Sequence, residues 1–137
     1  ELAEDTSTCE LAAAALGVEV GQIAKSLLYK AKQGFLMIVA AGDIRLDAKL
    51  VKELAGSRVR MATPEETLEV TGYPVGGVCP FVTATPVPVF LDRSLKRFEV
   101  VYAAAGTPHS ALPISYSELL RYTGGSPCSV SVRWEQE

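Results

Sequence analysis

The chain has 137 residues, of which 48% are hydrophobic and 21% are charged, and its formal net charge is −3. This composition excludes a disordered or fibrous chain and predicts one globular domain, residues 1–137, with its own hydrophobic core. The acidic balance argues against a broad basic face that coats nucleic acid, although it permits a local contact.

The sequence also lacks the usual signals of membranes, disulfide frameworks and metal centres. No apolar run approaches the roughly 20 residues of a membrane helix. Cys9, Cys79 and Cys128 are odd in number and form no CxxC pair, and His109 is the only histidine. We therefore expect a cytoplasmic protein with no membrane segment, no cofactor and no metal site.

The first predicted elements are a short helix and a hairpin. Residues 9–16 are rich in alanine and lie between Ser/Thr capping residues and Gly17, which predicts a helix. Within residues 24–43, two apolar runs flank a polar Lys-Gln-Gly break, which is typical of two paired strands.

Two further helices are marked by their caps. Asp47 precedes a run with helical apolar spacing that closes on Gly56. Thr63 and Glu66 form a capping box at the start of a second run, which ends at Gly72.

The C-terminal half continues the alternation. Residues 87–92 and 98–106 are predicted strands around one helical turn at 93–97, and residues 129–134 are a predicted closing strand. Between them, Ser115 and Glu118 cap another helix. Irregular alternation with a tight hairpin predicts an α+β fold, with a mixed, mostly antiparallel sheet or open barrel surrounded by short helices.

The segment TGYPVGGVCPF, residues 71–81, predicts a shaped loop. Its glycines permit unusual backbone conformations and close approach of a partner, and its prolines restrict the backbone. A rigid connector is the simpler interpretation. The interspersed apolar residues instead favour a loop that packs inward while its backbone amides face a ligand.

Lys25 is the most informative charged residue of the hairpin. In a strand that starts near Ala24, Lys25 shares a face with Leu27 and Tyr29, while Ser26 lies on the other face. A lysine among apolar neighbours either extends its ammonium to water or holds an anionic or carbonyl group. The pattern alone favours extension to water.

Five blocks of sequence carry a family resemblance over nearly the whole chain. In order they are LAAAALGVEVGQIAKSLLYK, GDIRLDAKLVKELAG, MATPEETLEVTGYPVGGVCP, FLDRSL and AAAGTPHSALPISYSELLRYTGG. Together they resemble the YbaK/ProX family of aminoacyl-tRNA editing domains, which also occur inserted in bacterial prolyl-tRNA synthetases. The family usually has an extra helix and strand before the first alanine-rich helix, so relative to the family this sequence is short at its start.

The resemblance implies an aminoacyl-tRNA deacylase, an ester hydrolase that removes a wrong amino acid from the 3′ end of a tRNA. The family's lysine matches Lys25, and its GxxxP loop matches residues 76–80. The implied catalytic residues are Lys25, Gly76 and Gly77, and the implied substrate-binding residues are Ser26, Val78, Pro80, Gly106 and His109. In this family the ribose hydroxyl of the substrate is thought to help activate water.

The resemblance also implies the substrate and partners. It points to a small amino acid such as cysteine or alanine on proline tRNA, with the tRNA acceptor end as partner, prolyl-tRNA synthetase as a further candidate partner, and a monomer or homodimer. Ala105-Gly106 stands where the family often has two glycines, which leaves substrate choice open, and His109 is equally a surface-loop residue. The alternative function is a non-catalytic module that binds an aminoacyl or nucleotide-like ligand.

Overall fold

The structure is a computed structural model that describes residues 2–104 and 111–132. Its elements, in chain order, are α1 (Leu2–Leu16), η1 (Val20–Gln22), β1 (Ile23–Ala31), β2 (Gly34–Ala41), α2 (Ala48–Ala55), β3 (Val59–Met61), α3 (Pro64–Thr71), β4 (Val89–Asp92), η2 (Arg93–Arg97), β5 (Val101–Ala104), β6 (Ala111–Ile114), α4 (Tyr116–Thr123) and β7 (Ser126–Cys128). The two η elements are 3₁₀ turns.

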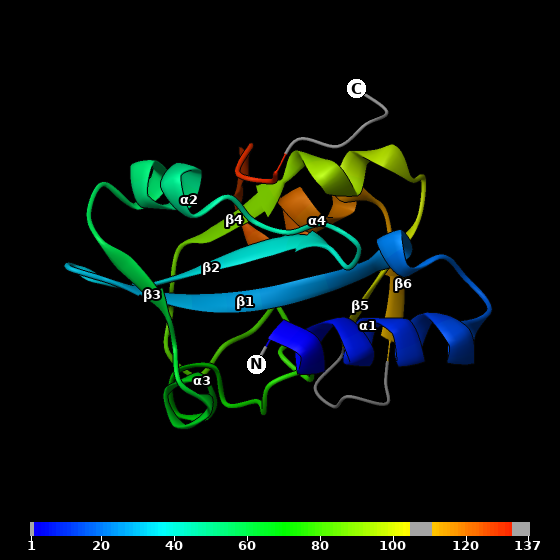
Figure 1. Ribbon diagram of the computed structural model, residues 1–137, viewed down its shortest axis with the longest axis horizontal. Helices are drawn as coiled ribbons and strands as arrows, with labels where there is room; N and C mark the ends of the chain where they lie inside the picture. Colours follow the sequence, from blue (N-terminus) through cyan, green and yellow to red (C-terminus); the bar gives the residue numbers. More distant parts are fainter. Residues whose placement is uncertain (1, 105–110, 133–137) are drawn as a thin grey trace.

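The strands form one mixed sheet in the order β6-β5-β1-β2-β4-β7, with β3 also paired to β1. The pairs β1/β2, β1/β3 and β5/β6 are antiparallel, and the pairs β1/β5, β2/β4 and β4/β7 are parallel. The β1–β2 hairpin, from Ala24↔Ala41 to Ala31↔Gly34, is the longest pairing and crosses the molecule (Figure 1). The predicted α+β class with a mixed sheet and short helices is confirmed.

The predicted caps of three helices are also confirmed. The side chains of Asp47, Thr63 and Ser115 accept hydrogen bonds from backbone N–H groups in the first turns of α2, α3 and α4. Each of these helices ends at a glycine with a left-handed backbone, namely Gly56, Gly72 and Gly124. Asp92 likewise caps η2, because its carboxylate accepts the N–H of Ser94 at 3.0 Å.

The core lies on both faces of β2, which explains why this strand reads as a continuous apolar run. Met37 and Val39 belong to the cluster that packs against α3 and the following loop. Leu36 and Ile38 belong to the cluster beneath α2. Accordingly, α2 and α3 lie on opposite sides of the β1–β2 hairpin (Figure 1). None of the helices in the described ranges is long and apolar enough to cross a membrane.

Several elements differ from the sequence-based expectations, including β4 and β5, which begin at Val89 and Val101 rather than at residues 87 and 98. Helix α1 begins at Leu2 rather than near Cys9, and the short strands β3 and β6 were not predicted. The last strand of the described chain is residues 126–128, not 129–134. Its ladder stops because the N–H of Val130 donates to the buried Asp92 carboxylate at 2.7 Å, and residue 131 instead bridges Leu46. Residues 133 and 134 lie outside the described residues.

Candidate functional site

The candidate site begins at a gap beside β1. On the side of β1 away from β2, β5 pairs with Ile23 and Ala24, and β3 pairs from Tyr29 onward. Within the described part of the chain, residues 25–28 thus have no partner strand on this side, apart from the bond that the Leu28 carbonyl accepts from Ala62 at 2.9 Å. This gap places side chains of β1 next to the loop that follows α3.

A cavity of about 90 Å³ occupies this position, and its wall is largely apolar. Residues 23–27 of β1 form one wall. The other described lining residues are Cys9 and Ala12 of α1, Val75, Gly76 and Val78 of the loop, Tyr102 and Ala104 of β5, and Ala111 of β6. An apolar cavity of about 150 Å³ in another protein holds benzene, so this one accepts a smaller group.

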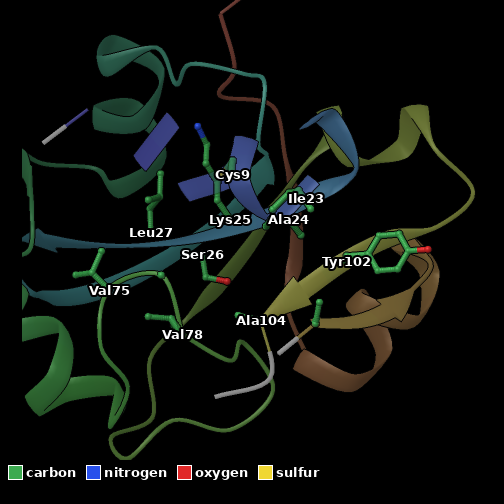
Figure 2. A pocket seen from close by; sticks show the side chains of 13 residues that line it. Cys9, Ile23, Ala24, Lys25, Ser26, Leu27, Val75, Val78, Tyr102 and Ala104 are labelled. Atoms are coloured by element: carbon green, nitrogen blue, oxygen red, sulfur yellow. The ribbon is translucent and has the colours of Figure 1, made fainter. Parts of the chain in front are cut away.

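Lys25 supplies positive charge to the wall of this cavity. Its side chain and that of Leu27 extend to one side of β1, while Ser26 points to the other side (Figure 2). The Lys25 ammonium neither extends freely to water nor stands unpaired, because it donates a hydrogen bond to the carbonyl oxygen of Ile44 at 2.7 Å. A lysine ammonium has three donors, so this bond leaves two for a ligand.

Ser26 supplies a hydroxyl on the opposite side of the strand. Figure 2 shows the Ser26 side chain on the side of β1 where the loop residues Val75 and Val78 lie. The Ser26 Oγ is buried and has no hydrogen-bond partner among the described residues. A buried hydroxyl without a partner is costly, and a bound polar group would satisfy it.

The loop reaches the cavity through a tight turn. The N–H of Gly77 donates to the carbonyl of Pro74 at 2.9 Å, and Gly76 has φ +88°, a conformation that favours glycine. Gly76 and Val78 line the cavity. The Gly77 amide closes the turn, and Gly77 itself is buried and is not among the residues that line the cavity. Pro80 is also buried and does not line the cavity.

The two ends of the loop are held at the C-terminus of α3. The N–H groups of Ala84 and Thr85 donate to the carbonyls of Thr71 and Val70, at 3.0 and 2.8 Å. The Thr71 hydroxyl donates to Thr67 O at 2.6 Å and accepts from the N–H of Tyr73 at 3.1 Å. These bonds fix residues 72–84 as a closed loop rather than an open connector.

The structure thus brings Lys25, Ser26, Gly76 and Val78 together, while Gly106 and His109 lie outside the described residues. Sequence reasoning did not place α1 at the site. Cys9 and Ala12 are three residues apart and therefore share a helix face, which was the available signal. No group of three or more His, Cys, Asp and Glu side chains in residues 2–104 and 111–132 is arranged to hold a metal ion.

Comparison with known proteins identifies the class to which this fold and pocket belong. The profile of the aminoacyl-tRNA editing domain matches residues 3–122. The chain therefore belongs to the family of aminoacyl-tRNA editing domains, which confirms the resemblance seen in the sequence.

Three relatives illustrate this membership. The chain is 41% identical to the uncharacterised protein YwhH of Bacillus subtilis strain 168, over 90% of this chain and 79% of that protein. It is 38% identical to the proline–tRNA ligase of Thermotoga maritima, where the match spans 84% of this chain but only 22% of the ligase. A crystal structure proposed to be a trans-editing enzyme for prolyl tRNA synthetase aligns with a TM-score of 0.87 at 39% identity, over 91% of this chain and 80% of that one.

Proposed function

We propose that the chain, as a single editing domain, hydrolyses the ester that joins a small, wrongly attached amino acid to the 3′ end of a tRNA, with proline tRNA as the preferred carrier. The observation that carries this proposal is the small apolar cavity with Lys25, Ser26 and Gly76 in its wall. The cavity volume of about 90 Å³ favours a side chain of the size of alanine or cysteine. The kinship with proline–tRNA ligases favours proline tRNA.

In this proposal the protein orients and polarises an ester that is already reactive. The Lys25 ammonium binds the 3′-terminal ribose or the ester carbonyl through the donors that Ile44 leaves open. The backbone N–H groups of Gly76 and Val78, two residues that line the cavity, stabilise the oxyanion that develops when water attacks the carbonyl. Attack breaks the acyl–oxygen bond and releases the amino acid and the ribose hydroxyl.

The decisive experiment measures single-turnover deacylation of proline tRNA charged separately with alanine, cysteine, serine and proline. Hydrolysis of alanyl or cysteinyl tRNA, with prolyl tRNA spared, is the expected result. Lys25→Ala should lower the rate about a hundredfold or more, because it removes a charged donor from the transition state.

Lys52→Ala is the matched control, since Lys52 is an exposed lysine on α2 outside the cavity wall. It should hydrolyse at the wild-type rate. Tight binding of aminoacyl-tRNA by the wild type without any hydrolysis would instead identify a non-catalytic binding module. A folded Lys25→Ala variant with full activity would remove Lys25 from the mechanism.

A further inference from the structure

The carbonyl that holds Lys25 belongs to the turn after β2. The N–H of Ile44 donates to the carbonyl of Ala41 at 3.1 Å, which closes this turn, and the Ile44 side chain is buried in the core. The Ile44 carbonyl then accepts the Lys25 ammonium at 2.7 Å. The position of the ammonium therefore depends on the geometry of residues 41–44.

A second segment, η2, forms hydrogen bonds with this turn through its side chains. The Arg97 guanidinium forms two bonds to the Asp43 carboxylate, from Nη2 to Oδ1 at 2.6 Å and from Nη1 to Oδ2 at 3.2 Å. The Nε of Arg97 donates to the carbonyl of Ser94 at 2.9 Å. The hydroxyl of Ser94, in turn, accepts the N–H of Ala41 at 3.1 Å.

Segment η2 thus contacts the turn that presents the Ile44 carbonyl at two of its residues, Ala41 and Asp43. Ser94 is fully buried, and its own N–H is fixed by Asp92. A fork of two parallel bonds between arginine and a carboxylate restrains orientation as well as distance. Asp92 and Ser94, which take part in this arrangement, belong to the FLDRSL block of the sequence, none of whose residues lines the cavity.

We infer that the Asp43–Arg97 ion pair is a positioning device for Lys25, acting through the Ile44 carbonyl on the ammonium at the cavity. The kinetic part of this inference rests on the proposed deacylase function. Arg97 and Asp43 do not line the cavity, so they are positioning residues and not catalytic ones.

Arg97→Ala should lower kcat for deacylation about ten- to a hundredfold and change KM less than about twofold, since a displaced catalytic group mainly affects the chemical step. The melting temperature should fall by no more than about 4 °C, because the pair is partly exposed, with 26% and 39% of the two side chains accessible. Arg97→Lys keeps the charge but loses the fork, and it should recover part of kcat.

The chain offers a matched control in the Arg60–Glu66 pair. This pair has the same forked geometry, at 2.8 and 2.9 Å, but links β3 to α3. Arg60→Ala should leave kcat unchanged. Gly21→Ala tests the device without removing a charge, because a Cβ there would lie 2.9 Å from both the Asp43 carboxylate and the Phe98 ring. It should reproduce the loss of kcat.

A readout independent of activity is the NMR signal of the Lys25 side chain, observed at ¹⁵Nζ and ¹³Cε. Arg97→Ala should shift this signal and speed the exchange of its ammonium protons with water, whereas Arg60→Ala should not. If the wild type hydrolyses no aminoacyl-tRNA, the proposed function fails, and the NMR comparison still decides the positioning role. An unmoved Lys25 signal in folded Arg97→Ala would overturn the inference, and so would an active wild type with unchanged kcat in that variant.

Discussion

At the level of single residues, tertiary contacts determine which of the side-chain interactions allowed by the sequence pattern forms at the site. The strand pattern allowed Lys25 either to reach water or to hold a carbonyl or anionic group. The structure selects a backbone carbonyl, and the acceptor is Ile44, nineteen residues later in the chain. No local pattern encodes this bond, because it depends on where the turn after β2 comes to rest. Ser26 was correctly placed on the opposite face of the strand, since alternation along a strand is a local property.

The residue-scale prediction concerns Ala12, which lines the cavity from α1. Ala12→Leu should abolish most deacylation of a small aminoacyl-tRNA, because three added carbon atoms enter a space of about 90 Å³. The helix should tolerate leucine at a cost of only a few tenths of a kcal/mol in propensity. Activity assays and melting curves on the same preparation measure both effects.

Ala15→Leu provides the comparison, because Ala15 is an exposed residue of the same helix. It should retain wild-type hydrolysis. Equal activity of the two leucine variants would show that the aminoacyl group does not enter this cavity.

At the scale of elements, the loop after α3 is held by the last turn of that helix. Thr71 is 1% exposed, and its hydroxyl connects Thr67 O to the N–H of Tyr73. Thr123 repeats this arrangement at the end of α4, where it donates to Leu119 O at 2.6 Å and accepts from the N–H of Gly125 at 3.0 Å. The C-terminus of α3 leads into the loop that lines the cavity, whereas the C-terminus of α4 leads into β7.

Thr71→Val should therefore loosen the loop as well as destabilise the fold. It leaves the Tyr73 N–H without its acceptor, which costs about 1–3 kcal/mol. Hydrogen exchange at the amides of Ala84 and Thr85, which close the loop, should accelerate, and deacylation should fall.

Thr123→Val removes an equivalent hydroxyl far along the chain from the loop. It should lower the melting temperature but leave amide exchange at residues 84 and 85 and the activity per folded molecule unchanged. Identical exchange at these two amides in both valine variants would contradict a specific role for Thr71 in closing the loop.

The elements differ in how well the sequence predicts them, for physical reasons. Helices α2, α3 and α4 were predicted with their caps, because capping is a local contact within a few residues. Strands β3 and β6 are three and four residues long and carry little periodic signal of their own. The loop was predicted to approach a ligand, but the choice of Gly76 rather than Gly77 at the cavity wall follows from the turn bond to Pro74. The part of the cavity wall that α1 contributes could not be predicted from the sequence, because it depends on how this helix packs against β1.

On the scale of the whole molecule, one end of the sheet combines two half-buried groups, a phenol and a thiol, whose pKa values are raised. The Tyr116 hydroxyl donates to the carbonyl of Leu91 at 2.8 Å, and burial raises the pKa of Tyr116 to about 12. Burial, with the nearby Asp92 charge, also raises the pKa of the Cys128 thiol to about 12. Asp92 itself holds β4, η2 and Val130 together through two backbone N–H groups. This end anchors η2, and through it the turn that contacts Lys25.

The final prediction is that stability declines in base through this end of the sheet. Below about pH 9, Cys128 is protonated in both the folded and unfolded chains, so its contribution to stability is fully present. Above that pH the unfolded chain loses the thiol proton, while the folded chain keeps it until about pH 12. The unfolded state then binds fewer protons, and the free energy of unfolding falls with rising pH. Between pH 9 and 11 we expect Cys128 to account for about 1 kcal/mol of this fall, a value reduced for the partial exposure of the thiol.

Urea melts at each pH should show a shallower decline for Cys128→Ala than for the wild type, and a wild-type decline for Cys79→Ala. Parallel curves for the wild type and Cys128→Ala would refute the assignment of the effect to this thiol.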